Sequence, residues 1–197
     1  QRYATDLLLA GVAAGQRGLP PPDPALFIAA LGDILRDEAR DPALAAEMIT
    51  LPSEDYIAER MDTIDVEAIH AAREALRGAI ADALEADLEQ IHRDGRPAGP
   101  YSPDAQAAGR RALANAALAH LAALPRFHAL AVQCYRTAAN MADRMAALRV
   151  LTDIDIPERQ AALDDFHDRY RGDALVLDKW LGLQAVSALP GTLASVE

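Results

Sequence analysis

Cysteine and aromatic residues are scarce in this sequence. Cys134 is the single cysteine among 197 residues, which excludes an internal disulfide and favours a reducing compartment such as the cytoplasm. Aromatic residues make up only 5% of the chain, although 51% of it is hydrophobic. The apolar content is therefore mostly alanine and leucine, which suits close helix packing and argues against a β-sandwich.

Basic patches and long apolar runs are also missing. The formal net charge is -11, and the longest concentration of basic residues is the pair Arg110 and Arg111. We therefore expect no nucleic-acid partner and no binding to an anionic membrane surface. No apolar run approaches the roughly 20 residues that a transmembrane helix needs, so we expect no membrane association at all.

The two ends of the sequence lack the usual signals. The opening QRYATDLLLAG has neither the basic segment nor the cleavage site of a signal peptide. It starts without methionine in a pattern typical of an amphipathic helix, and the sequence stops at TLASVE. We expect on these grounds that the chain is a piece of a longer polypeptide.

Helix starts are marked repeatedly along the chain. A side chain that can accept a hydrogen bond precedes a proline at Asp23-Pro24, Asp41-Pro42 and Ser102-Pro103. This pattern is typical of an N-cap followed by the first helical position, where the missing N–H of proline costs nothing. A further start is expected within a residue or so of Pro157, and Gly172 stands where the helix that follows should end.

Between these marks the apolar residues recur at helical spacing. The longest stripe predicts one helix from about Asp65 to His92, while Gly15–Pro24 and Arg93–Asp104 are rich in glycine and proline and predict loops. Sustained alternation of the kind that strands show is absent. The sequence therefore predicts an all-α fold, an irregular α-solenoid or helical array of about ten mostly short helices, forming a single unit over residues 1–197.

The sequence contains no convincing reactive site. The histidines do not form the i, i+4 pair or Cys/His cluster that a zinc site needs, and His70 with Glu74 suggests only a surface pair. Cys134 lies on an apolar helix face and is expected to be buried and inert, while Met141 and Met145 are expected to fill the core. We predict no catalytic, cofactor-binding or metal-binding residue in this chain.

Three long segments nevertheless resemble the C-terminal helical domain of the bacterial aminopeptidase N family of zinc peptidases. They are DPALAAEMITLPSEDYIAERMDTIDVEAIHAAREALR (Asp41–Arg77), ANMADRMAALRVL (Ala139–Leu151) and LVLDKWLGLQA (Leu175–Ala185). Their order and spacing also match, so that the resemblance spans essentially the whole chain. It implies that residues 1–197 form the N-terminal part of that domain.

The resemblance implies a function for the parent enzyme. It does not imply that this chain carries any of the catalytic residues. The family removes N-terminal amino acids from peptides with a zinc ion held by H-E-x-x-H and a downstream glutamate, and it binds the substrate amine with G-x-M-E-N. Neither motif occurs here, so no catalytic or zinc-binding residue can be assigned. The expected role is to enclose the active-site chamber and restrict substrate access, with the catalytic and β-domains of the parent as partners and its peptides as substrates.

Two other interpretations stay open at this point. A self-standing α-solenoid that binds a partner protein would use the same architecture, and an enzyme with a nonstandard site is a weaker alternative. One segment bears on structure in any case, because Asp178 and Lys179 interrupt an otherwise apolar helix. We expect Leu177, Trp180, Leu181 and Ala185 to form its packing face. For Asp178 we expect a structural partner, either an arginine or the helix start near Asn140, whereas Lys179 can reach solvent.

Overall fold

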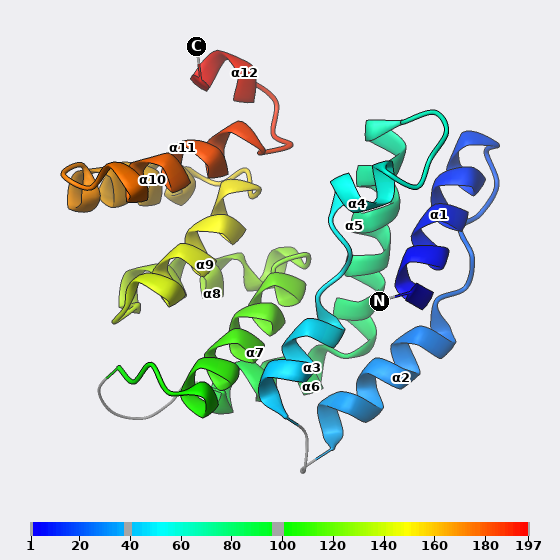
Figure 1. Ribbon diagram of the computed structural model, residues 1–197, viewed down its shortest axis with the longest axis horizontal. Helices are drawn as coiled ribbons and strands as arrows, with labels where there is room; N and C mark the ends of the chain where they lie inside the picture. The colour runs from blue at the N-terminus through cyan, green and yellow to red at the C-terminus, as the bar shows by residue number, and fades with distance from the viewer. Residues whose placement is uncertain (1, 38–40, 96–100, 197) are drawn as a thin grey trace. The chain divides into compact units, whose positions relative to one another are not determined.

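The computed structural model describes residues 2–37, 41–95 and 101–196. These residues form helices and connecting turns without a strand, which confirms the predicted all-α array (Figure 1). The elements are α1 (Arg2–Gln16), α2 (Ala25–Arg36), α3 (Pro42–Ile49), α4 (Glu54–Ala58), α5 (Val66–Ala83), α6 (Glu85–Asp94), α7 (Ala105–Leu121), the 3-10 turn η1 (Pro125–Phe127), α8 (His128–Thr137), α9 (Met141–Thr152), α10 (Pro157–Tyr170), α11 (Ala174–Ala185) and α12 (Thr192–Val196).

The helices group into two compact units, Gln1–Leu124 and Pro125–Glu197. The first unit, here called unit 1, holds α1 to α7, and the second, unit 2, holds η1 and α8 to α12. No shift in composition marks this division in the sequence. The expectation that residues 1–197 act as a single helical unit stays a prediction.

In unit 1 the closest helix packing lies between α3 and α7, with α6 on another side of α7 and α1 packed along α5 (Figure 1). Gly109 lets α3 and α7 approach, because a Cβ added there would lie 3.0 Å from the backbone nitrogen of Ala43. The core between these helices is made of fully buried aliphatic side chains such as Ile49, Ile80 and Leu118. The many small alanine side chains thus allow the helices to pack at short distances from one another.

The predicted helix starts are close to the observed ones. The Asp41 side chain accepts hydrogen bonds from the backbone of Ala43 and Leu44, and Pro42 is the first residue of α3. Helix α10 begins at Pro157. Two starts differ. Helix α2 begins at Ala25, with Pro24 rather than Asp23 at its N-cap. In α7, Asp104 rather than Ser102 caps the helix by accepting from the backbone N–H of Ala107, 2.9 Å away.

The long helix predicted from Asp65 to His92 is wrong, because the chain breaks at Leu84 into α5 and α6. Neither glycine nor proline marks the break, and Leu84 is itself buried, so the apolar stripe runs through it. The bend directs α5 toward α1 and α6 toward α7. Two acidic residues in the first turn of α6, Glu85 and Asp87, are the one local signal of a new N-terminus.

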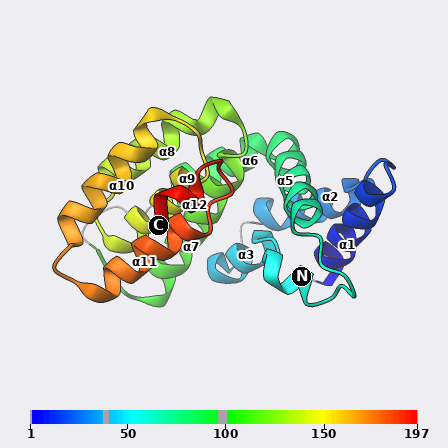
Figure 2. The same ribbon diagram turned by 90° about the horizontal axis from the view of Figure 1, so that it is seen from above.

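Unit 2 is built on α9, which packs against α8, α10 and α11 (Figure 2). The core includes Leu148, Leu151, Leu163 and Phe166, which are all fully buried. At the C-terminal end of α9 the carbonyl of Thr152 accepts two hydrogen bonds of 2.9 Å, from Arg159 Nε and from Ser187 Oγ. These bonds satisfy a carbonyl that the helix end leaves unpaired, and they tie α10 and the turn after α11 to α9.

Candidate functional site

Within residues 2–37, 41–95 and 101–196, no group of three or more histidine, cysteine, aspartate or glutamate side chains could hold a metal ion. Cys134 is buried, as predicted. His70 lies 2.8 Å from Glu54 on α4. The pairing of His70 with Glu74 is therefore wrong, because Glu74 instead binds the guanidinium of Arg77.

Two histidines of unit 1 are buried and serve the packing of helices. His120 Nε2 donates to the carbonyl of Ile49 at 2.8 Å, and His92 Nδ1 lies 3.0 Å from the carbonyl of Ala114. Burial lowers the pKa of His120 to about 4, and the nearby charges of Arg73 and Arg77 act in the same direction. The imidazole is thus held neutral, as a structural donor rather than a general acid.

A polar cluster in unit 2 links α8 to α10. Tyr135 donates its hydroxyl to Asp165 at 2.8 Å, and Arg169 Nε donates to the same carboxylate oxygen at 2.7 Å. Burial, helped by Asp165, raises the pKa of Tyr135 well above its usual value. The hydrogen bond from Arg169 lowers the pKa of Asp165. The tyrosine therefore stays protonated and the aspartate ionised, and neither is prepared to transfer a proton near neutral pH.

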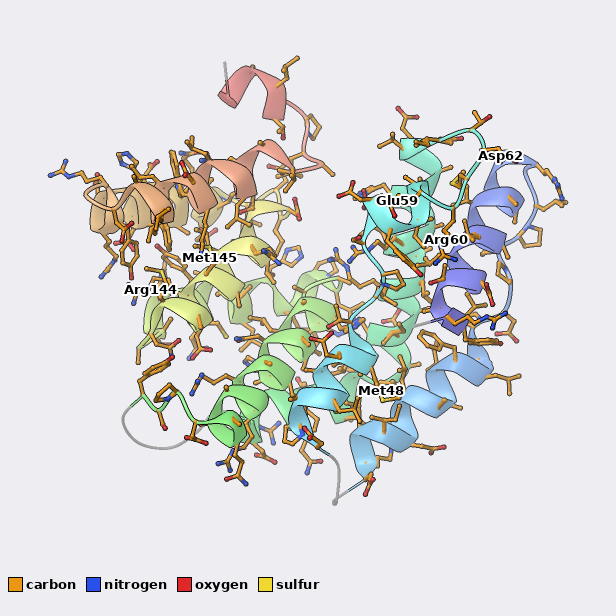
Figure 3. The ribbon with its side chains drawn as sticks, viewed as in Figure 1. Met48, Glu59, Arg60, Asp62, Arg144 and Met145 are labelled. Carbon is orange, nitrogen blue, oxygen red and sulfur yellow. The ribbon has the colours of Figure 1, made fainter. Side chains whose placement is uncertain are left out.

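Side chains on α9 border this cluster. Arg144 projects from α9 next to Met145 in the sequence (Figure 3). Its guanidinium carbon lies 5.9 Å from the centre of the Tyr135 ring, and the side chain also donates to the carbonyl of Ala138. Met145 and Met141 are only half-buried, so the expectation that both fill the core is not met. Their helix instead buries Ala147, Leu148, Leu151 and Thr152.

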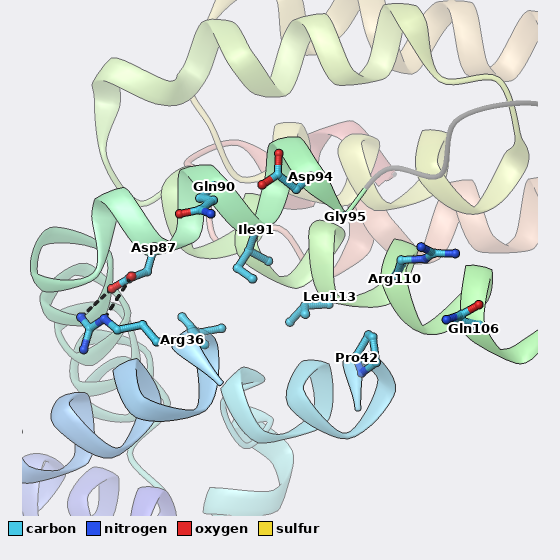
Figure 4. A pocket seen from close by; sticks show the side chains of 11 residues that line it. Arg36, Pro42, Asp87, Gln90, Ile91, Asp94, Gly95, Gln106, Arg110 and Leu113 are labelled. Carbon is cyan, nitrogen blue, oxygen red and sulfur yellow. Dashed lines mark hydrogen bonds and ion pairs between the residues drawn. The ribbon is translucent and has the colours of Figure 1, made fainter. Parts of the chain in front are cut away.

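Unit 1 carries a pocket of about 460 Å³. An ion pair closes one side of it, with Arg36 Nη2 at 2.6 Å from Asp87 Oδ2 (Figure 4). Arg110, Asp94 and Gln106 add polar groups to the lining. Cations and carboxylates balance one another among the described residues that line it, and no nucleophile lies beside a base among them. These residues therefore give no indication of a particular reaction.

Helix α11 carries the residues that the sequence singled out. Trp180 is half-buried, donates its indole N–H to the carbonyl of Leu163 at 2.9 Å, and lies 5.0 Å from the His167 ring. Asp178 and Lys179 are exposed, and within the described part of the chain neither side chain forms a hydrogen bond or ion pair. The partner expected for Asp178 is thus not found in the part of the chain that the structure describes, where its side chain is exposed to solvent.

The packing face expected for α11 is only partly the observed one. Leu177 and Trp180 are half-buried, but Leu181 and Ala185 are exposed, and Leu183 and Gln184 are buried instead. The apolar residues of α11 are distributed around the whole helix, so the sequence pattern does not indicate which side packs against the core. The structure therefore reveals an apolar face on α11 that periodicity alone could not assign.

Helices long and apolar enough to cross a membrane are absent from the part of the chain that the structure describes. The described residues thus include two buried histidines that hold helices together, a tyrosine–aspartate pair with fixed protonation states, and a pocket lined by equal numbers of cations and carboxylates. No metal cluster and no nucleophile–base pair is assembled among these described residues.

The chain is similar to known aminopeptidases. It is 39% identical over 169 residues to aminopeptidase N of Caulobacter vibrioides and 36% identical over 187 residues to aminopeptidase N of Escherichia coli. These matches cover 85% and 94% of this chain but only 20% and 21% of the relatives. The chain therefore spans about a fifth of the length of the curated relatives that it matches, and the resemblance to aminopeptidase N is confirmed.

A solved structure shares the fold. Aminopeptidase A of Legionella pneumophila, crystallised in complex with aspartic acid, superposes with a TM-score of 0.84 over 98% of this chain and 24% of that one, at 23% sequence identity. A family model described as "Domain of unknown function (DUF3458_C) ARM repeats" matches residues 1–197. Since that model covers the whole sequence, the chain belongs to the DUF3458_C family of ARM-repeat domains.

Proposed function

We propose that this chain is a noncatalytic helical domain of a longer zinc-dependent aminopeptidase, where it helps to enclose the active-site chamber and limits which peptides enter. The observation that supports this best is the similarity to aminopeptidase N over 94% of this chain but 21% of the relative. The partners would be the catalytic and β-domains of the same polypeptide, the substrates would be peptides, and the compartment would be the cytoplasm.

The residues of this chain do not fit the zinc of the proposed parent. In the described ranges no three possible ligands converge, and the full sequence lacks H-E-x-x-H and G-x-M-E-N. The domain's contribution would instead be physical, because a helical wall keeps bulk water and folded proteins away from a reacting centre. An α-helical array suits this task since its stacked helices form an extended surface.

The test is an assay of the longer protein that carries this chain. Hydrolysis of aminoacyl anilides and of peptides of increasing length is measured with and without a zinc chelator, and the 197-residue chain is assayed alongside. We expect chelator-sensitive release of N-terminal residues by the longer protein and none by the isolated chain. Absence of such activity in the longer protein, or turnover by the isolated chain, contradicts the proposal.

A further inference from the structure

Helix α11 exposes a wide apolar face. At 100° per residue its exposed positions fall within an arc of about 160°, and we call them the α11 outer face: Ala174, Leu175, Asp178, Lys179, Leu181, Gly182, Ala185 and Val186. Leu175 is 75% exposed, Leu181 51% and Val186 78%. A helix face that stays in water normally carries polar side chains.

The neighbouring helix shows what a solvated face looks like in this protein. Among the exposed residues of α10 are Gln160, Asp164, Asp168 and Arg169. On α11, by contrast, six of the eight outer-face residues are apolar or glycine. The contrast lies within one unit of one chain, so it does not arise from overall composition.

The centre of the α11 outer face is shaped for close contact. Gly182 lies there, between Ala185 and Asp178 on the adjoining turns, and a Cβ added at Gly182 would meet nothing within 4 Å. Small side chains allow two helix axes to approach closely. Asp178, unpartnered in the described residues, sits in the middle of this small and apolar surface, where covering it would demand a donor.

We propose that the α11 outer face is the docking site of another α-helix of the same, longer polypeptide, which covers Leu175 and Leu181 and places a cationic side chain opposite Asp178. This inference rests on the proposed function, namely on the chain being one part of a longer aminopeptidase. The curated relatives extend far beyond the match, which covers 20% and 21% of them. Repeat arrays such as the ARM repeats of this family bury each layer of helices against the next.

A second copy of the chain fits this face less well. In a two-fold pair the same patch meets itself. Asp178 lies about 20° from the middle of the exposed arc and Lys179 about 80°, so a two-fold axis through the middle brings the two Asp178 carboxylates together and leaves the lysines at the edges. Like charges at close range repel, and the repulsion grows as water leaves the interface. A helix that carries a cation instead satisfies the carboxylate and covers the leucines at once.

The test introduces a thiol at the centre of the face in the longer protein. Gly182→Cys is compared with Gly15→Cys, a matched control, because Gly15 is also helical and exposed and an added Cβ there would also meet nothing within 4 Å. Alkylation of each introduced thiol is followed by peptide mass spectrometry. We expect labelling at position 182 to be at least about tenfold slower, because reaction then requires the covering helix to open.

A second variant keeps the test decisive if Gly182→Cys does not fold. Ala185→Cys places the thiol one turn further along the same face, and the same protection is expected. Equal labelling rates on the α11 outer face and at position 15 overturn the inference. Protection that disappears on dilution assigns the face to a second copy and also overturns it.

Aminopeptidase activity is measured on the same preparations. An active longer protein with a freely labelled α11 outer face contradicts only the docking inference. A longer protein without aminopeptidase activity contradicts the proposed function, whatever the labelling rate.

Discussion

His120 on α7 donates Nε2–H to the backbone carbonyl of Ile49, 2.8 Å away at the C-terminal end of α3. The bond joins the two most closely packed helices of unit 1 and satisfies a carbonyl that the helix end leaves unpaired. Burial is the main reason why the imidazole stays neutral, and the nearby charges of Arg77 and Arg73 disfavour a further positive charge in the same place. The charge state of His120 is thus coupled to the packing of α3 on α7.

The first prediction concerns acid. The pKa of His120 falls from an ordinary 6.5 to about 4 on folding, so the unfolded chain binds the proton more readily. The contribution of His120 to the free energy of unfolding is fully present above pH 6.5 and is lost as the pH falls toward 4. The loss is on the order of 3 kcal/mol. Urea unfolding of the 197-residue chain at pH 7.5 and pH 4.5, followed by circular dichroism, measures it.

His120→Gln serves as the control for that experiment. Its amide can still donate to Ile49 but has no proton to gain in this range. Carboxylates titrate equally in both proteins, so the wild type should lose more stability than the variant between the two pH values. Identical pH dependence in the two proteins would contradict the coupling.

A second prediction tests the close approach of α3 and α7. A methyl group at Gly109 would lie 3.0 Å from the Ala43 nitrogen and 3.2 Å from the Ala43 Cβ, and backbone atoms yield little. Gly109→Ala should therefore lower the free energy of unfolding by about 1–3 kcal/mol, as overpacking does. Gly78→Ala is the matched control, because an added Cβ there meets nothing within 4 Å. It should stabilise α5 by about 0.5–1 kcal/mol. Denaturation midpoints that move in the same direction would refute the close approach.

Much of the fold follows from the sequence through local chemistry. Asp41 caps α3 and Pro42 opens it because the acceptor and the missing N–H suit those positions, whatever the rest of the chain does. The break at Leu84 escapes the sequence because it is made by tertiary packing. Leu84 is buried, and the chain bends so that α5 and α6 cover different helices.

The contacts of His120 and the exposed face of α11 are harder to predict from the sequence. The lack of zinc motifs can be read directly from the sequence. The hydrogen bond from His120 to Ile49 joins residues 71 positions apart, and no local pattern predicts it. Helix α11 is apolar on all sides, so no period distinguishes its packed side from its exposed one. The observed burial of Leu183 and Gln184, beside the exposure of Leu181, separates the two sides.

A third prediction addresses the polar cluster of unit 2. Tyr135→Phe removes the hydroxyl that Asp165 accepts at 2.8 Å and leaves the aromatic packing in place. Because Arg169 still binds that carboxylate, the free energy of unfolding should fall by only about 1 kcal/mol. Trp180, the single tryptophan, reports the transition of unit 2 by fluorescence. An unchanged midpoint would show that the hydroxyl bond adds nothing over hydration.

The last prediction concerns Asp178, whose effect should depend on context. In the 197-residue chain the side chain is exposed and without a partner among the described residues, so Asp178→Ala should change stability by less than about 0.5 kcal/mol. In the proposed longer protein the carboxylate would be covered and paired, and the same substitution should cost about 1.5–3 kcal/mol by leaving its partner unpaired.

Lys179→Ala should have little effect in either protein, because a lysine at the edge of the face extends its amine into water. Thermal unfolding of both proteins with both variants measures this difference. Equal, small shifts for Asp178→Ala in the two contexts would show that the carboxylate stays solvated in the longer protein as well.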